Sequence, residues 1–251
     1  MSNDYDALAP VYDILEIGNF AEALTPMLVD YALRHEWMGR RIMSVGCGTG
    51  KGLSWLAQHG YLLTAVDQSE AMLTVAKENL KSSRGTIDWH QQNILKLEGI
   101  DNMDMVLALN VMGELNTLKE LETAFQAIRR TLHNERLFIF DIYTIEGLVI
   151  RQQSGDQLLQ DQDNLTVFAT NHYDYERQIQ ARHYRIYHQQ SDQQWQRVDA
   201  KRTLRSYPIQ AVLALVKRAK FEVATVLTHD LQPYDPGKAH TERVIILAKS
   251  T

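Results

Sequence analysis

The stretch of the sequence with the clearest chemical potential is RRIMSVGCGTGKG, residues 40–52, in which glycines alternate with other residues directly after an apolar run. The four glycines are Gly46, Gly48, Gly50 and Gly52. Closely spaced glycines after an apolar run predict a buried strand that ends in a loop, and the absence of side chains lets a ligand approach the loop backbone closely. A ligand-binding loop is therefore expected here.

The spacing of the glycines separates the kinds of nucleotide-binding loop. A dinucleotide loop, G-x-G-x-x-G, would place its third glycine at Lys51 or Leu53. A phosphate loop, G-x-x-x-x-G-K-S/T, would need a glycine at Val45 and a hydroxyl residue at Gly52. Neither pattern fits. The pattern that remains is G-x-G-x-G, which does not require a pyrophosphate.

An acidic residue follows at the distance at which nucleotide-binding folds hold a ribose. Asp67 ends the apolar run YLLTAVD, about 20 residues after Gly46. A carboxylate at the end of a strand can accept two hydrogen bonds from the adjacent hydroxyls of a ribose. The loop and Asp67 together predict a nucleoside-containing ligand.

The elements around these residues alternate between strands and helices up to about residue 141. Apolar runs predict strands, and amphipathic stretches predict helices, one of them with Asp67 or Ser69 as its N-terminal cap. This alternation predicts an α/β protein with a parallel sheet covered by helices on both faces. The strands are expected within residues 41–46, 61–67, 86–94, 103–110 and 136–143, and the helices within 20–38, 51–60, 69–81 and 117–133.

The pattern changes after Asp141. Residues 147–164 are polar and rich in glutamine, which predicts an irregular connection. Three antiparallel strands are expected in the aromatic and β-branched runs that follow. A helix with Pro208 in its first turn and two more strands complete the sheet. The antiparallel runs are 165–175, 178–189 and 195–207, and the last elements are 208–220, 221–230 and 242–250. We expect an N-terminal helical cap (1–39), a core (40–147 and 207–251) and an inserted antiparallel β-sheet that forms a substrate lid (148–206).

The composition limits the kinds of partner. The 251 residues carry 26 basic and 31 acidic side chains, a net charge of −5, which gives no general attraction to nucleic acids or anionic membranes. Cys47 is the only cysteine, so no internal disulfide can form. There is no signal-peptide pattern and no apolar run of roughly 20 residues. We expect a soluble, cytoplasmic monomer or homodimer without nucleic-acid or membrane partners.

The order of the motifs resembles a known family. VGCGTG, then LLTAVDQSEAML, then MDMVLALNVMGEL closely resemble class I S-adenosylmethionine-dependent methyltransferases. The segment YDALAPVYDIL also resembles the N-terminal signature of a small-molecule branch of that family. The resemblance runs from about residue 5 to the C-terminus. It implies a Rossmann-like, seven-stranded and mostly parallel sheet whose last strand is antiparallel, and S-adenosyl-L-methionine as cofactor.

The resemblance also implies roles for individual residues. Asp67 would hold the ribose hydroxyls. The residues that would bind the cofactor are Tyr12, Gly46, Cys47, Gly48, Asp67, Gln68, Met72, Asn93, Ile94, Leu109 and Asn110. Those that would contact the substrate are Tyr5, Tyr143, Arg205 and Tyr207, and the catalytic candidates near the methyl group are Tyr12, Asn110 and Glu114. Ser44 departs from the family, which usually has an acidic residue there, and we expect cofactor binding weaker by about 1 kcal/mol.

The implied reaction is an in-line displacement that moves a methyl group to a nitrogen, oxygen or carbon atom of a metabolite. Such a transfer depends mainly on the alignment of the reacting atoms, and it needs a general base only when the acceptor arrives protonated. Two alternatives remain open: a methyltransferase acting on macromolecules, and a regulatory protein that binds S-adenosylmethionine or S-adenosylhomocysteine without turnover. The histidines of the insertion lack the H-x-x-x-H spacing of zinc sites, so no metal is expected. They are His172, His183 and His188.

Overall fold

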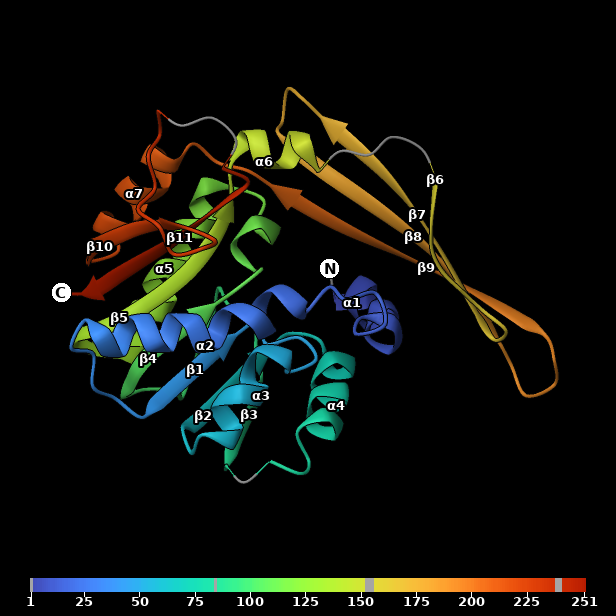
Figure 1. Ribbon diagram of the computed structural model, residues 1–251, viewed down its shortest axis with the longest axis horizontal. Helices are drawn as coiled ribbons and strands as arrows, with labels where there is room; N and C mark the ends of the chain where they lie inside the picture. The colour runs from blue at the N-terminus through green and yellow to red at the C-terminus, as the bar shows by residue number, and fades with distance from the viewer. Residues whose placement is uncertain (1, 84, 152–155, 238–240) are drawn as a thin grey trace.

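A seven-stranded sheet lies at the centre of the protein (Figure 1). The computed structural model describes residues 2–83, 85–151, 156–237 and 241–251. The strands run in the order β10-β11-β5-β4-β1-β2-β3, with β11 antiparallel to both of its neighbours. This is the predicted mostly parallel sheet, and the antiparallel last strand is confirmed. The strands are β1 (Arg41–Val45), β2 (Leu62–Asp67), β3 (Ile87–Gln91), β4 (Met103–Ala108), β5 (Leu132–Tyr143), β10 (Phe221–Thr228) and β11 (Arg243–Ser250).

Helices cover both faces of this sheet because successive strand residues point to opposite sides. On one face, α2 (Asn19–Arg34) and α3 (Lys51–Gln58) pack against alternate residues of β1, β4 and β5. On the other face, α5 (Leu118–Thr131) and α7 (Ile209–Arg218) enclose a group of aromatic rings. The ring centroids of Phe138 and Phe140 lie 4.7 Å apart there. Both core layers hold the carboxyl ends of the parallel strands in fixed positions.

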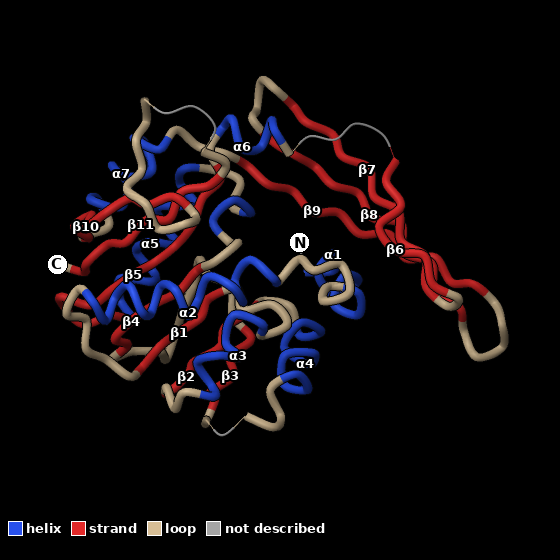
Figure 2. Tube along the Cα trace, in the orientation of Figure 1, coloured by secondary structure: helices blue, strands red, loops and turns tan. Residues whose placement is uncertain are grey.

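The insertion forms a separate four-stranded antiparallel sheet, which we call the lid (Figure 2). Its strands are β6 (Asp156–Gln162), β7 (Leu165–Asp174), β8 (Ile179–Gln189) and β9 (Trp195–Arg205). The inner face of the lid is largely apolar and packs against the N-terminal segment, residues 2–13, which includes α1 (Ser2–Leu8) and the 3₁₀ helix η1 (Ala9–Val11). Met72 of α4 (Glu70–Asn79) belongs to the same apolar cluster.

Three aspartates of the N-terminal segment form hydrogen bonds that hold this segment against the lid and the edge of the main sheet. The backbone N–H of Lys201 in the lid donates to Asp4 at 2.9 Å, and the Ser69 hydroxyl donates to Asp6. Asp13 accepts hydrogen bonds from Thr49 of the glycine loop at 2.6 Å and from Asn79 of α4 at 2.8 Å. The N-terminal segment therefore connects the lid to the sheet.

Some local predictions were wrong. Residues 147–164 are not irregular: they include most of the short helix α6 (Ile145–Ile150) and the strand β6, separated by residues 152–155, which lie outside the described residues. β6 is an edge strand held by backbone pairing to β7, and this pairing needs no apolar side chains. The first long helix ends at Arg34, and Pro208 is the cap that precedes α7. Of the two predicted caps of α4, Ser69 is confirmed, because its side chain accepts from the Met72 N–H. No helix within the described ranges is long and apolar enough to span a membrane.

Candidate active site

The glycine loop between β1 and α3 adopts backbone angles that favour glycine. Gly46, Gly48 and Gly50 have φ angles of 64°, 54° and 81°. A Cβ atom on Gly46 would lie 2.5 Å from the Val111 side chain, whereas one on Gly48 would meet only the Tyr12 ring, at 3.8 Å. The loop therefore packs tightly against the fold at Gly46 and leaves space above Gly48, where a cavity opens beneath Tyr12.

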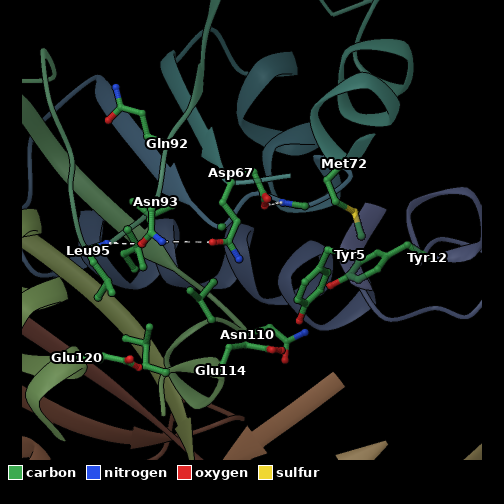
Figure 3. A pocket seen from close by; sticks show the side chains of 17 residues that line it. Tyr5, Tyr12, Asp67, Met72, Gln92, Asn93, Leu95, Asn110, Glu114 and Glu120 are labelled. Carbon is green, nitrogen blue, oxygen red and sulfur yellow. Dashed lines mark hydrogen bonds between the residues drawn. The ribbon is translucent and has the colours of Figure 1, made fainter. Parts of the chain in front are cut away.

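Asp67 links this loop to the end of β2. The Gly48 N–H donates to Asp67 Oδ2 at 2.8 Å (Figure 3). The Ser69 N–H donates to Asp67 Oδ1 at 2.9 Å. Burial raises the pKa of Asp67, and these backbone hydrogen bonds oppose that rise. Each oxygen keeps a lone pair that can accept a further hydrogen bond, and the carboxylate lines the cavity. Because these lone pairs can accept hydrogen bonds, the Asp67 carboxylate can bind the two hydroxyls of a diol.

The cavity continues past Asp67 to the end of β3. There Asn93 accepts a hydrogen bond from the Leu95 N–H at 2.8 Å and donates to the Gln68 side chain at 3.4 Å. The apolar side chains of Ile94 and Leu95 complete this end, beside the amide groups of Gln68 and Asn93. The arrangement suits a heterocyclic base such as adenine.

Two tyrosines from the N-terminal segment converge with two residues of the segment that follows β4 at the other end of the cavity. Figure 3 shows Tyr5 and Tyr12 directed toward Asn110 and Glu114. Burial raises the pKa of Tyr12 to about 12 and the pKa of Tyr5 well above its usual value. Both phenols therefore stay protonated near neutral pH and can donate hydrogen bonds.

The lid reaches this end of the cavity through Arg202 of β9. Its Nε atom donates to Glu114 Oε1 at 2.7 Å and to the Tyr5 hydroxyl at 3.2 Å. The Arg202 and Glu114 side chains are only 9% and 15% exposed, so their ion pair is largely shielded from solvent. Arg202 thus joins the lid, the N-terminal segment and the core at one point.

A second buried ion pair holds Asn110, which follows β4. Asn110 has a φ angle of 65°, and its N–H donates to Asp141 of β5. Asp141 pairs with Arg243 of β11 at 2.9 Å, and Arg243 donates to the Asn110 side chain at 3.3 Å. The Arg243 guanidinium lies 3.9 Å from the centre of the Tyr143 ring. These contacts fix Asn110 in a left-handed conformation.

The structure brings most of the sequence-predicted site residues to this one cavity. The predicted residues that line it are Tyr5, Tyr12, Gly46, Gly48, Asp67, Gln68, Met72, Asn93, Ile94, Asn110 and Glu114. Five others are absent from its lining: Cys47, Leu109, Tyr143, Arg205 and Tyr207. Cys47 and Leu109 pack into the core layer under α2 and α3. Tyr207 donates its hydroxyl to the Leu115 carbonyl at 2.7 Å, and Tyr143 packs on Arg243.

Sequence reasoning missed several residues that line the cavity or support it. The additional lining residues are Val45, Gln92, Leu95, Val111, Leu115 and Glu120. Most of these are next to predicted positions, so an extension of each motif by one or two residues would have found them. Arg202, Asp141 and Arg243 had no such signal, because their partners lie far away in the sequence.

Comparison with known proteins places this geometry in context. Residues 42–135 match the model of a family described as a methyltransferase domain. A protein of Geobacillus sp. (strain WCH70) that is named as a methyltransferase is 36% identical over 106 residues, which are 42% of this chain and 43% of that protein. YqeM of Bacillus subtilis (strain 168), also named as a methyltransferase, is 24% identical over 213 residues, 84% of each chain. The chain thus matches less than half of the Geobacillus protein and most of YqeM.

Solved structures share the whole fold. An S-adenosylmethionine-dependent methyltransferase from Clostridium acetobutylicum ATCC 824 gives a TM-score of 0.82 at 18% identity and covers 98% of both chains. CalS10, an amino pentose methyltransferase from Micromonospora echinaspora whose structure contains S-adenosylmethionine, gives a TM-score of 0.71 at 16% identity and covers 96% of this chain and 97% of that one. The similarity therefore includes the lid and the N-terminal segment as well as the main sheet.

Proposed function

We propose that the chain is an S-adenosylmethionine-dependent methyltransferase and that it transfers a methyl group from S-adenosylmethionine to a small molecule. One cavity supports this proposal: its first end, at Asp67 and Asn93, suits a nucleoside, and its second end, at Tyr5 and Glu114, is lined by polar side chains. A lid and an N-terminal segment pack together over this cavity, which favours a small acceptor over a macromolecule.

The residues present fit the cofactor. Asp67 retains lone pairs for the ribose hydroxyls, and the space above Gly48 accommodates a ligand that lies against the loop backbone. Asn93, Gln68 and Met72 would surround the adenosine. When bound, S-adenosylmethionine supplies a methyl group on a positively charged sulfur, which a nucleophile can displace.

The polar end would bind and orient the acceptor. The Tyr5 and Tyr12 phenols can donate hydrogen bonds to the acceptor, and Glu114 can accept one from an amine or a hydroxyl. Asn110 offers its amide from the adjacent strand end. Because alignment supplies much of the rate in such a displacement, fixed donors and acceptors around the nucleophile are the main contribution required of the protein.

An acceptor with amine and hydroxyl groups agrees best with this set of side chains. The polar end combines hydrogen-bond donors with one carboxylate, and CalS10, which shares the fold, is described as an amino pentose methyltransferase. The net charge of −5 and the single cysteine support a cytoplasmic enzyme without nucleic-acid or membrane partners. We assign the domains as above, with residues 148–206 as the lid, and we propose a monomer or homodimer.

The test is calorimetry followed by turnover. S-adenosylmethionine and S-adenosylhomocysteine should both bind, and radiolabelled methyl should appear in a panel of amino and hydroxy metabolites but not in RNA or protein. A lack of binding to both nucleosides at millimolar concentration would refute the proposal. Binding without turnover on any panel would favour a regulatory binding protein instead.

A further inference from the structure

Three polar side chains form a row across the inner face of the lid, where apolar residues prevail. Asn171 of β7 is paired in register with Arg182 of β8, and Arg182 is paired with Arg202 of β9. The next row along the same face is Ala169, Tyr184 and Ala200, all buried against the N-terminal segment. We call Asn171, Arg182 and Arg202 the polar row.

Each member of the polar row has a buried atom without a hydrogen-bond partner among the described residues. These atoms are Asn171 Oδ1, Arg182 Nε and Arg202 Nη2. Asn171 and Arg202 are only 9% and 8% exposed. Buried polar atoms are nearly always paired in folded proteins, so three unpaired atoms in one row indicate that something else completes them.

The charges of the row are also unbalanced. Two guanidinium groups on directly opposite residues of neighbouring strands repel each other. Arg202 has Glu114 as its counter-ion, whereas Arg182 donates to the neutral Gln157 side chain at 3.2 Å and lies 5.4 Å from the centre of the Tyr184 ring. The exposed Glu16 lines the same hollow as Arg182, but the described residues show no ion pair between them. A positive charge therefore remains at Arg182.

The polar row lies beside the candidate active site. Arg202 contacts Tyr5 and Glu114, which both line the cavity. Arg182 lines a hollow together with residues 14–17 and Leu159, and the Ile17 carbonyl accepts a hydrogen bond from Asn110 at 3.4 Å. The row thus lies between the acceptor end of the cavity and a hollow at the surface.

We propose that the polar row binds an anionic group of the methyl acceptor, a carboxylate or a phosphate, between Arg182 and Arg202. This inference rests on the proposed methyl transfer. Guanidinium groups bind both anions through paired N–H donors, and Asn171 adds an NH2 group that donates to the anion when the amide is turned by 180°. The hollow that Arg182 lines together with residues 14–17 is the route by which the anion reaches the polar row.

The test is calorimetric titration of the protein with inorganic phosphate and, separately, with acetate, in the presence and absence of S-adenosylhomocysteine. Wild-type protein should bind one of the two anions in the millimolar range. The anion that binds identifies the group on the acceptor as a phosphate or a carboxylate. Arg182→Gln should weaken this binding by about tenfold or more, since a charge-assisted hydrogen-bond donor is lost.

Arg185→Gln is the matched control, because Arg185 lies on the same strand but on the outer face of the lid, where it pairs with Asp156. This control should bind the anion as wild type does. Arg182→Lys keeps the charge without the paired donors, so it should retain part of the affinity, and it serves in place of Arg182→Gln if that variant does not fold. Absence of anion binding by wild type, or equal binding by the Arg182 and Arg185 variants, would overturn the inference.

The same titrations separate this inference from the proposed function. Nucleoside binding without anion binding would remove the polar row as a ligand site and leave methyl transfer intact. Anion binding that persists without nucleoside binding would support the anion site and count against methyl transfer.

Discussion

The two ends of the cavity are held together in different ways. At the cofactor end, Asp67 binds backbone N–H groups that lie 19 and 2 residues away in the sequence. At the acceptor end, Arg202 binds Glu114 and Tyr5, which lie 88 and 197 residues away. The first end depends on two consecutive strand–loop–helix units, from β1 to α4. The second forms only when the lid, the N-terminal segment and the core have assembled.

This difference separates a part of the cavity that is positioned by local backbone hydrogen bonds from a part that is positioned by side chains distant in the sequence. At the cofactor end, backbone donors fix the Asp67 carboxylate, so the group expected to bind the ribose is positioned without help from distant side chains. The acceptor end consists of long side chains with buried charges, and a few substitutions there would change which molecule fits.

Replacement of Arg202 by methionine should lower the stability of the protein through the acceptor end of the cavity. The variant leaves Glu114 buried without its counter-ion, and such a loss costs about 3 to 5 kcal/mol of unfolding free energy. Urea denaturation measures it. Removal of both charges, in the double variant Arg202→Met with Glu114→Leu, should recover most of the stability. A cost below about 1 kcal/mol for the single variant would mean that the pair behaves like an exposed one.

Alkaline pH should weaken the fold through the buried tyrosines of the acceptor end. Tyr12 has its pKa raised by burial from 10.0 to about 12, so the folded state holds this proton more tightly than the unfolded state does. The stability from this difference is fully present below pH 10 and is lost as the pH rises toward 12, by roughly 2 to 3 kcal/mol. Denaturation of wild type and Tyr12→Phe across this range should show a shallower decline for the variant. Identical declines would contradict a buried, protonated Tyr12.

Substitution of Asn110 should separate its backbone strain from its side-chain function. Asn110→Ala places an ordinary side chain at a φ angle of 65° and should cost about 1 to 2 kcal/mol of stability, whereas Asn110→Gly should cost less. Both variants lose the amide, so both should lose turnover to a similar degree. Thermal unfolding and initial rates measure the two effects. Equal stability of the alanine and glycine variants would show that the left-handed conformation carries no strain.

The smallest expected effect concerns the cofactor end. Ser44→Asp restores the acidic residue that the family usually has before the glycine loop, and it should tighten S-adenosylmethionine binding by about fivefold, or about 1 kcal/mol. Calorimetry of wild type, Ser44→Asp and the uncharged Ser44→Asn compares the affinities. If the aspartate and asparagine variants bind equally, charge at this position does not matter.

The extent to which the sequence predicted this molecule follows the same division. The glycine spacing and Asp67 predicted the cofactor end, because each signal lies within one strand–loop–helix unit. The lid was predicted as three strands. The fourth, β6, was missed because an edge strand can be polar on both faces and still pair through its backbone. Arg202 and Arg243 gave no signal, since a buried ion pair across the fold leaves no local pattern.

The most direct test of the account is calorimetry of S-adenosylhomocysteine with Asp67→Ala and Arg202→Met beside wild type. We expect about a hundredfold loss of affinity for Asp67→Ala, since hydrogen bonds to a charged group are removed. Folded Arg202→Met should bind with an affinity close to that of wild type, because Arg202 contacts Glu114 and Tyr5 at the acceptor end. Equal losses in the two variants would contradict the division of the cavity into two independent ends.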